Sequence, residues 1–167
     1  LTEALRGFVS QRKHAIFPGD LNKVVDQACL FIEMLCKKRG IKLKKSMGTG
    51  PPVRLDPDYL LGALYNIMAN AVDAMPEGGV LSVVTALHDQ QVTLMVQDTG
   101  RGMSRTVLEQ IGRPFFTTKA SGTGLGVMIC KSIVERARGR WLIESQEGQG
   151  TKVTFWLPVA GERPASS

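Results

Sequence analysis

Apolar residues recur with a helical period in three long stretches of the chain, and each stretch predicts a helix. The three predicted helices cover about residues 21–39, from Asp56-Pro57 to about Met75, and 126–137. Asp20 can cap the first helix and Gly40 ends its pattern, whereas Pro57 suits the first turn of the second helix. A shorter helix is predicted near residues 104–111.

Alternating apolar and polar residues predict five strands. The predicted strands cover residues 41–45, 80–87, 91–97, 141–145 and 151–157. Residues 48–52 are predicted to be a loop, and residues 147–150 a turn that closes the last hairpin. The order of helices and strands favours an α+β fold, in which three helices cover one face of a mixed, mostly antiparallel sheet of about five strands. Such a fold is a two-layer sandwich.

The two ends of the chain do not follow this plan. Residues 1–17 carry apolar positions at helical spacing, and Pro18-Gly19 then breaks the pattern. We therefore expect residues 1–19 to be the end of a helix from a preceding domain with its linker, and 160–167 to be a disordered tail. Residues 20–159 would form one domain. Because the chain begins with Leu1, we expect it to be a piece of a longer protein.

Composition places the chain among ordinary globular proteins, because 43% of its 167 residues are hydrophobic. The net charge of +6 suits an anionic ligand but is too small to indicate a nucleic-acid partner. Three cysteines, Cys29, Cys36 and Cys130, form no metal-binding pattern, and their small number is typical of a reducing compartment. No apolar run approaches the ~20 residues of a membrane span, and no signal peptide is visible. We therefore expect a cytoplasmic location for this part of the protein, with an upstream membrane or sensor segment in the full-length protein left open.

Gly122, Gly124 and Gly126 alternate directly before the third predicted helix. Glycines leave room next to the backbone, and the N–H groups of a helix N-terminus attract anions. This pattern is typical of a phosphate-binding loop, although glycine-rich turns that only serve packing also occur. Phe115 and Phe116 precede the glycines, and these aromatic side chains either form a docking surface or pack the loop onto the domain.

The second predicted helix ends in polar residues that suit a metal ion. Asn66 and Asn70 are four residues apart, so both amides project from one helical face, and Asp73 follows one turn later. Amide oxygens suit Mg²⁺, which also binds phosphate oxygens of a substrate. The alternative is that both amides bond to neighbouring backbone.

Asp98, Gly100 and Gly102 follow the end of a predicted strand. A carboxylate at this position can accept a hydrogen bond from an exocyclic amine, and the glycines would let a flat ring approach the backbone. An ordinary Asp/Gly turn would explain the same residues. A second glycine-rich segment, residues 148–155, has a plain hairpin as its alternative.

Taken together, these segments resemble the ATP-binding domain of the Bergerat-fold ATPases and kinases, most closely the catalytic domain of bacterial sensor histidine kinases. The resemblance covers about residues 20–158 and is closest to the nitrogen-regulation, dicarboxylate-transport and sporulation type of sensor kinase. The matching motifs are the N box at residues 66–74, the first glycine box at 98–102, the F box at 114–119, the second glycine box at 122–126 and the last at 148–155.

The resemblance implies a role for each matching residue. Asp98 would bind the adenine amino group with help from Thr151 through water, and Asn70, aided by Asn66, would hold Mg²⁺. Lys119 is a candidate for a phosphate contact, and residues 103–121 would form a lid. The implied nucleotide-contacting set is Asn70, Asp73, Ala74, Asp98, Gly100, Gly102, Met103, Thr118, Lys119, Gly122, Thr123, Gly124, Leu125, Gly126 and Thr151.

The resemblance also implies partners that this chain does not contain. The phosphoacceptor of this family is a histidine that is followed by an acidic residue on a helical domain. His14 is followed by Ala15, and His88 lies in a predicted hairpin turn, so neither fits, and the acceptor histidine would lie on a separate helical dimerisation domain. That domain would make the full-length protein a homodimer and would be met by Phe115, Phe116 and residues 1–17. The phosphoryl group would then pass to the receiver domain of a response regulator.

Asn66 separates the kinase interpretation from the hydrolase interpretation. The ATPase branch of the resembled superfamily has a Glu at this position that activates water, and a neutral amide cannot act as a general base. Two other functions stay open: a serine kinase of the anti-sigma type, and a nucleotide-sensing interaction module without transferase activity.

Overall fold

The computed structural model describes residues 16–110 and 125–161, with the main chain only for residues 125–130. Its elements follow in the order β1 (Phe17–Gly19), α2 (Leu21–Lys38), β2 (Ile41–Met47), β3 (Val53–Leu55), α3 (Pro57–Asp73), β4 (Gly79–His88), β5 (Gln91–Asp98), α4 (Arg105–Gln110), α5 (Leu125–Arg136), β6 (Arg140–Gln146) and β7 (Gly150–Pro158). The predicted α+β fold and the three long helices are confirmed.

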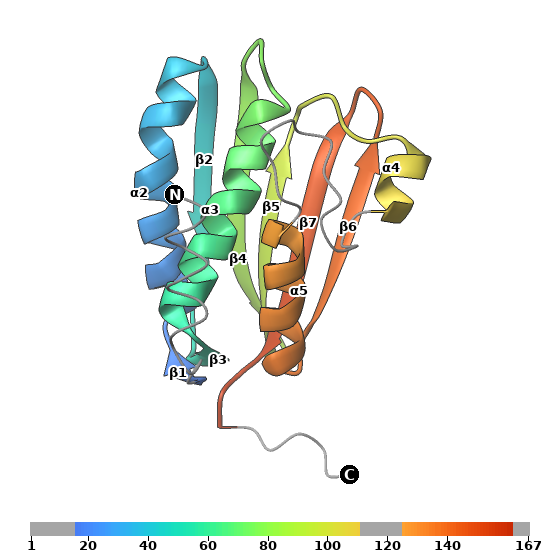
Figure 1. Ribbon diagram of the computed structural model, residues 1–167. Helices are drawn as coiled ribbons and strands as arrows, with labels where there is room; N and C mark the ends of the chain where they lie inside the picture. The colour runs from blue at the N-terminus through green and yellow to red at the C-terminus, as the bar shows by residue number, and fades with distance from the viewer. Residues whose placement is uncertain (1–15, 111–124, 162–167) are drawn as a thin grey trace.

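Five strands form one sheet in the order β2-β4-β5-β7-β6, and helices α2, α3 and α5 cover one of its faces (Figure 1). Every pairing in this sheet is antiparallel except β2 with β4, whose parallel connection runs through β3 and α3. The inward-facing residues of β4, β5 and β7 meet the buried faces of the helices and form one core. The sandwich predicted from the alternation is therefore confirmed, including its mixed sheet.

Local sequence signals set the helix ends as expected. The Asp20 side chain accepts a hydrogen bond from the Lys23 N–H at the start of α2, and Asp56 caps α3 in the same way. Gly40 follows α2 with a φ of +68°, a conformation that glycine adopts without strain. The apolar side of α2 is buried and includes both Cys29 and Cys36, whose thiol pKa values are raised by burial.

Two strands were not predicted. Residues 17–19, expected to be the end of a helix and a linker, form β1, which pairs antiparallel with β3 in a separate two-stranded sheet. Both strands have only three residues, too few to show an alternation, and Pro18 argues against a strand when the sequence is considered alone. The pairing places β1 directly before α2 and β3 directly before α3.

A buried polar network joins α2 to the sheet. The Thr85 hydroxyl, on a side chain that is 2% exposed, donates to Asn22 Oδ1 at 2.7 Å and accepts from the Gly48 N–H at 3.1 Å. The Asn22 amide in turn donates to the Gly48 carbonyl at 2.9 Å. This network fixes the end of β2 against the start of α2.

Replacing Thr85 by Val should lower the free energy of unfolding by about 1–2 kcal/mol, because the part-buried Asn22 Oδ1 loses its donor, whereas the Gly48 N–H keeps its hydrogen bond to the Thr85 carbonyl. Chemical denaturation measures this change. Thr93→Val is the matched control: Thr93 is only half-buried, and its hydroxyl donates to the Ala86 carbonyl at 3.3 Å. The control should change stability by no more than about 0.5 kcal/mol. An equal loss of unfolding free energy in the two variants would show that the buried network stabilises the domain no more than an ordinary half-buried hydroxyl does.

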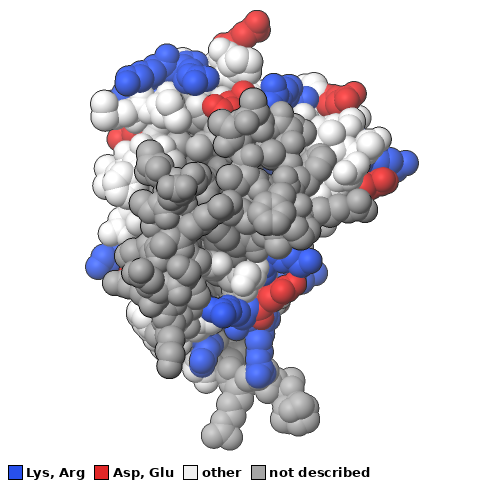
Figure 2. Space-filling view, in the orientation of Figure 1, with Lys and Arg blue, Asp and Glu red and all other residues white. Residues whose placement is uncertain are grey.

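Charge is distributed unevenly over this fold. Residues 21–47, which include α2 and β2, carry seven Lys and Arg against two acidic residues, a net charge of +5 out of +6 for the whole chain. Lys and Arg side chains gather over the end of α2 that leads into β2 (Figure 2). No helix within the described residues is both long and apolar enough to span a membrane.

Candidate functional site

The candidate site lies at the end of the sandwich where α3 and β5 both end (Figure 1). The segment that follows β5 is held there on two sides. The Arg101 N–H donates to the Ala74 carbonyl at 3.0 Å, and the Arg101 carbonyl accepts from the Gly148 N–H at 2.7 Å. The first contact joins it to the end of α3, and the second to the β6–β7 turn. The N box, the first glycine box and the last glycine box therefore meet in space.

Asp98 is the buried carboxyl group of this site. It is the last residue of β5 and is 5% exposed. Its Oδ1 accepts from the Gly100 N–H at 2.8 Å and from the Thr151 N–H at 3.3 Å. Burial raises the pKa of Asp98, while these two backbone hydrogen bonds act in the opposite direction. Within the described part of the chain Oδ2 accepts no hydrogen bond, so it can accept one from a ligand.

The glycines of the site serve close packing of the chain against itself. A Cβ on Gly100 would contact the Ala74 carbonyl oxygen, and one on Gly150 would contact the carbonyl oxygen of Asp98. Gly102 has a φ of +67° and faces the Gln146 carbonyl in the same way. The sequence suggested that such glycines make room for a ring. In the structure, these three let separate backbone segments approach each other, and this approach fixes Asp98 in place.

Ser145 belongs to the site but was missed by the sequence analysis. Its hydroxyl accepts from the Met103 N–H at 2.8 Å, donates to the Gly150 carbonyl at 3.1 Å and lies 2.8 Å from the Thr151 hydroxyl. Ser145 thereby holds Met103 and Thr151, both predicted site residues, next to each other. One signal was available: Ser145 is a polar residue in the inward phase of β6, after Trp141 and Ile143.

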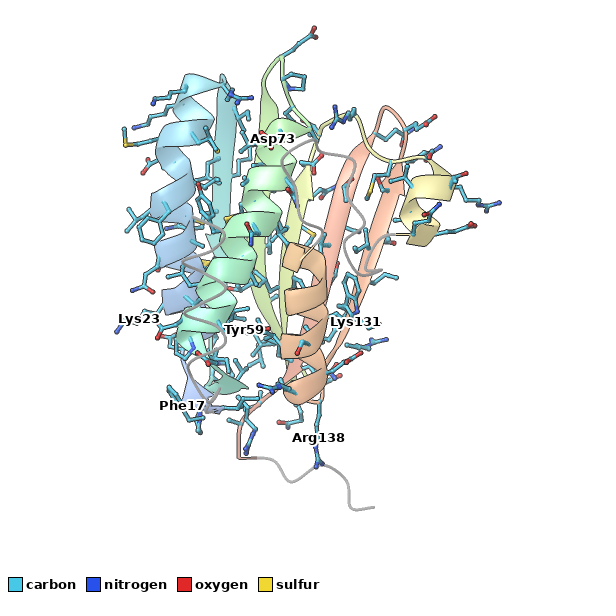
Figure 3. All side chains as sticks on the ribbon, in the orientation of Figure 1. Phe17, Lys23, Tyr59, Asp73, Lys131 and Arg138 are labelled. Carbon is cyan, nitrogen blue, oxygen red and sulfur yellow. The ribbon has the colours of Figure 1, made fainter. Side chains whose placement is uncertain are left out.

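Asn66, Asn70 and Asp73 lie along the last two turns of α3, with Asp73 at the end next to the site (Figure 3). Asn70 is one helical turn before Ala74, about 6 Å along the axis, and Asn66 is one turn earlier. The described residues contain no group of three or more His, Cys, Asp and Glu that could hold a metal ion. The two amides, on one face of α3, fit a cation that takes its other ligands from phosphates and water.

Several predicted site residues lie outside the described residues: Thr118, Lys119, Gly122, Thr123 and Gly124, together with the aromatic residues Phe115 and Phe116. Leu125 and Gly126 are the first two residues of α5, one residue earlier than the predicted start of this helix. Of the lid expected over 103–121, the described part comprises residues 103–110, with Met103 bonded to Ser145 and α4 near β6.

Residues 55–161 match the family described as histidine kinase-, DNA gyrase B-, and HSP90-like ATPase. The chain belongs to this family. Among sensor kinases of known sequence, it is 38% identical over 141 residues to sensor histidine kinase ZraS of Escherichia coli (strain K12), which covers 84% of the chain and 30% of ZraS. It is 41% identical over 110 residues to sporulation kinase E of Bacillus subtilis (strain 168), covering 65% of the chain and 15% of that kinase.

Solved structures of histidine kinases share this fold. The nucleotide-free catalytic domain of histidine kinase ThkA superposes with a TM-score of 0.77 at 27% identity, covering 87% of the chain and 96% of the ThkA domain. The mycobacterial sensor histidine kinase MprB superposes with a TM-score of 0.73 at 25% identity, covering 86% and 97%. The resemblance to the ATP-binding catalytic domain of sensor histidine kinases is thus confirmed. This domain spans less than a third of the length of ZraS and of sporulation kinase E.

Proposed function

We propose that this domain binds ATP with Mg²⁺ and transfers the γ-phosphoryl group to a histidine on a helical dimerisation domain elsewhere in the full-length protein. The proposal rests on membership of the kinase and ATPase family and on one observation at the site. That observation is the buried carboxyl of Asp98, fixed through Oδ1 by two backbone N–H groups. Its second oxygen is a hydrogen-bond acceptor, which suits the exocyclic amine of adenine.

Asn70 and Asn66 would hold the Mg²⁺ ion on α3, which ends beside Asp98. When bound, the ion would neutralise charge on the phosphates of the nucleotide. The backbone N–H groups around Leu125 and Gly126, at the start of α5, would hold the phosphates, because a helix N-terminus favours anions. Thr151, held by Ser145, would support the adenine contact of Asp98.

The transfer step needs no base from this domain. A neutral imidazole nitrogen of the acceptor histidine would attack Pγ, the bond between Pγ and the β,γ-bridging oxygen would break, and ADP would leave with the electron pair. The imidazole N–H proton would pass to water. The phosphoryl group would then move to an aspartate of a response regulator receiver domain. Asn66 cannot take a proton from water, so transfer to protein is favoured over hydrolysis.

The full-length protein would be a homodimer through the helical domain, and this domain would act in the cytoplasm. These statements follow from the resemblance to sensor histidine kinases. The family match with ATPases and kinases supports a nucleotide ligand.

Radiolabelled ATP tests the transfer. Incubation with [γ-³²P]ATP should label an added histidine-bearing helical domain of the full-length protein and leave this chain unlabelled. Asn70→Ala should slow labelling about 100-fold, the typical loss when one group that stabilises the transferred charge is removed. Gln27→Ala is the control, because Gln27 is exposed on α2, away from the site.

Acid stability of the label separates the alternatives. Phosphohistidine is lost in acid, whereas an acid-stable label on a serine would support the anti-sigma type of kinase and contradict our proposal. If the domain binds ATP but labels neither the helical domain nor a protein serine, its function would be that of a nucleotide-sensing module.

A further inference from the structure

The outer face of α2 exposes three large apolar side chains. Leu30 is 69% exposed, Phe31 63% and Met34 69%, and they are the most exposed large hydrophobic residues in the described part of the chain. Spaced at i, i+1 and i+4, they lie together on one face of the helix. We call these three residues the apolar ridge. The opposite face of α2 is fully buried in the core, so the ridge is additional to what folding requires.

The nucleotide site does not use the apolar ridge. Its residues come from the end of α3, from β5 and from the β6–β7 hairpin, whereas α2 lies at the outer edge of the sandwich beside the edge strand β2 (Figure 1). A helix in this position presents a ridge and not a groove.

The charge around the ridge is mainly positive. The two acidic residues of α2 are already paired, Asp26 with Lys45 at 2.6 Å and Glu33 with Lys37 at 3.8 Å. Three cations on or directly after α2 have no acidic ion-pair partner among the described residues: Lys23, Lys38 and Arg39. Lys23 projects from the first turn of α2 (Figure 3), and Lys38 is its last residue, so they lie beyond opposite ends of the ridge.

We propose that the outer face of α2 docks on an anionic lipid surface. Leu30, Phe31 and Met34 enter the head-group layer, and the cations at both ends of the ridge lie against lipid phosphates. Apolar residues bordered by Lys are typical of helices that lie in a membrane interface, and each Lys near an anionic leaflet adds to the attraction. The contact is reversible, because three side chains bury little apolar area.

Vesicle sedimentation tests this surface with the chain as it stands. The probes are vesicles of phosphatidylcholine with about one third phosphatidylserine, and vesicles of phosphatidylcholine alone. We expect binding to the anionic vesicles that weakens as salt is added. The triple variant Leu30→Gln, Phe31→Gln, Met34→Gln and the double variant Lys23→Glu, Lys38→Glu should each lower the partition coefficient at least about tenfold. All five side chains are exposed, so the fold and ATP binding should be unchanged.

The matched controls replace exposed apolar and basic side chains that lie outside α2. Leu142→Gln removes an exposed apolar side chain from β6, and Arg54→Glu with Arg138→Glu reverses two exposed charges at the end of the sandwich away from the site. Both should bind vesicles like the unmodified chain. Absence of binding to anionic vesicles overturns the proposal, as does binding that the control variants lower equally. Loss in the lysine variant alone would mean simple adsorption without the ridge. Vesicle-independent self-association lost in the triple variant would assign the ridge to a protein interface instead.

Discussion

Replacing Asp98 by Asn is expected to weaken ATP binding about 100-fold, which corresponds to about 2–3 kcal/mol for a lost hydrogen bond to a charged group. The amide keeps one oxygen for the N–H groups of Gly100 and Thr151. Its NH₂ group then replaces Oδ2 and faces the adenine amine, donor against donor. Isothermal titration calorimetry with ATP and ADP, with and without Mg²⁺, measures the change.

Asp89→Asn is the matched control for this variant. Asp89 lies in the turn before β5, at the opposite end of the strand that carries Asp98, and its side chain is exposed. The control should bind ATP like the unmodified domain. If Asp98→Asn also keeps full affinity while the domain binds ATP, the adenine contact is made elsewhere and the proposed role of Asp98 is wrong.

The same variant has a pH signature in stability. Burial raises the pKa of Asp98 above its usual 3.8, so ionisation costs more in the folded state than in the unfolded chain. This cost is absent below the unfolded pKa and is fully present above the folded pKa. The stability of Asp98→Asn relative to the unmodified domain should therefore be greater at pH 7 than at about pH 3. Chemical denaturation at both pH values tests the sign.

Gly150→Ala is expected to destabilise the domain by about 3 kcal/mol and to abolish ATP binding. Gly150 has a φ of +84°, which costs an alanine about 1–2 kcal/mol. Its new Cβ would also meet the carbonyl group of Asp98 and lie 3.1 Å from Thr99 Cα. Both are backbone atoms that cannot move away cheaply, and overpacking of this kind costs about 1–3 kcal/mol. Denaturation and calorimetry together measure the two effects.

Gly148→Ala separates strain from close approach. Gly148 has a similar φ of +78° in the same hairpin, but nothing lies within 4 Å of an added Cβ. This control should lose only about 1 kcal/mol and keep ATP binding. Equal losses for the two variants would mean that backbone conformation alone matters, and that β7 does not position Asp98 by direct packing.

The periodicity of the sequence was enough to predict the sheet strands and the long helices, because each of these elements buries one face. It failed for β1 and β3, which are held by pairing with each other and not by an apolar pattern of their own. The sequence predicted a mixed sheet but not that β2 pairs parallel with β4, because the pairing of strands depends on contacts between distant segments.

For the site, sequence reasoning identified Asp98 and Thr151 but could not place them together without the resemblance. They are brought into contact by the antiparallel pairing of β5 with β7, which no local pattern encodes. Ser145 could not be identified from the sequence for the same reason. Its hydroxyl contacts Met103, Gly150 and Thr151, which lie on other segments of the chain and come close to it only in the folded structure. The proposed roles of Asn66 and Asn70 stay predictions.

The hydrogen bond from Thr151 to Asp98 joins residues that are 53 positions apart. Closing this loop costs chain entropy before contacts between β5 and β7 compensate for it, so we expect the carboxyl to acquire its second N–H late in folding. Nascent or partly folded chains with a complete β4–β5 hairpin therefore lack a finished site. A nucleotide that binds only the native state would then mainly lower the unfolding rate and would change the folding rate little.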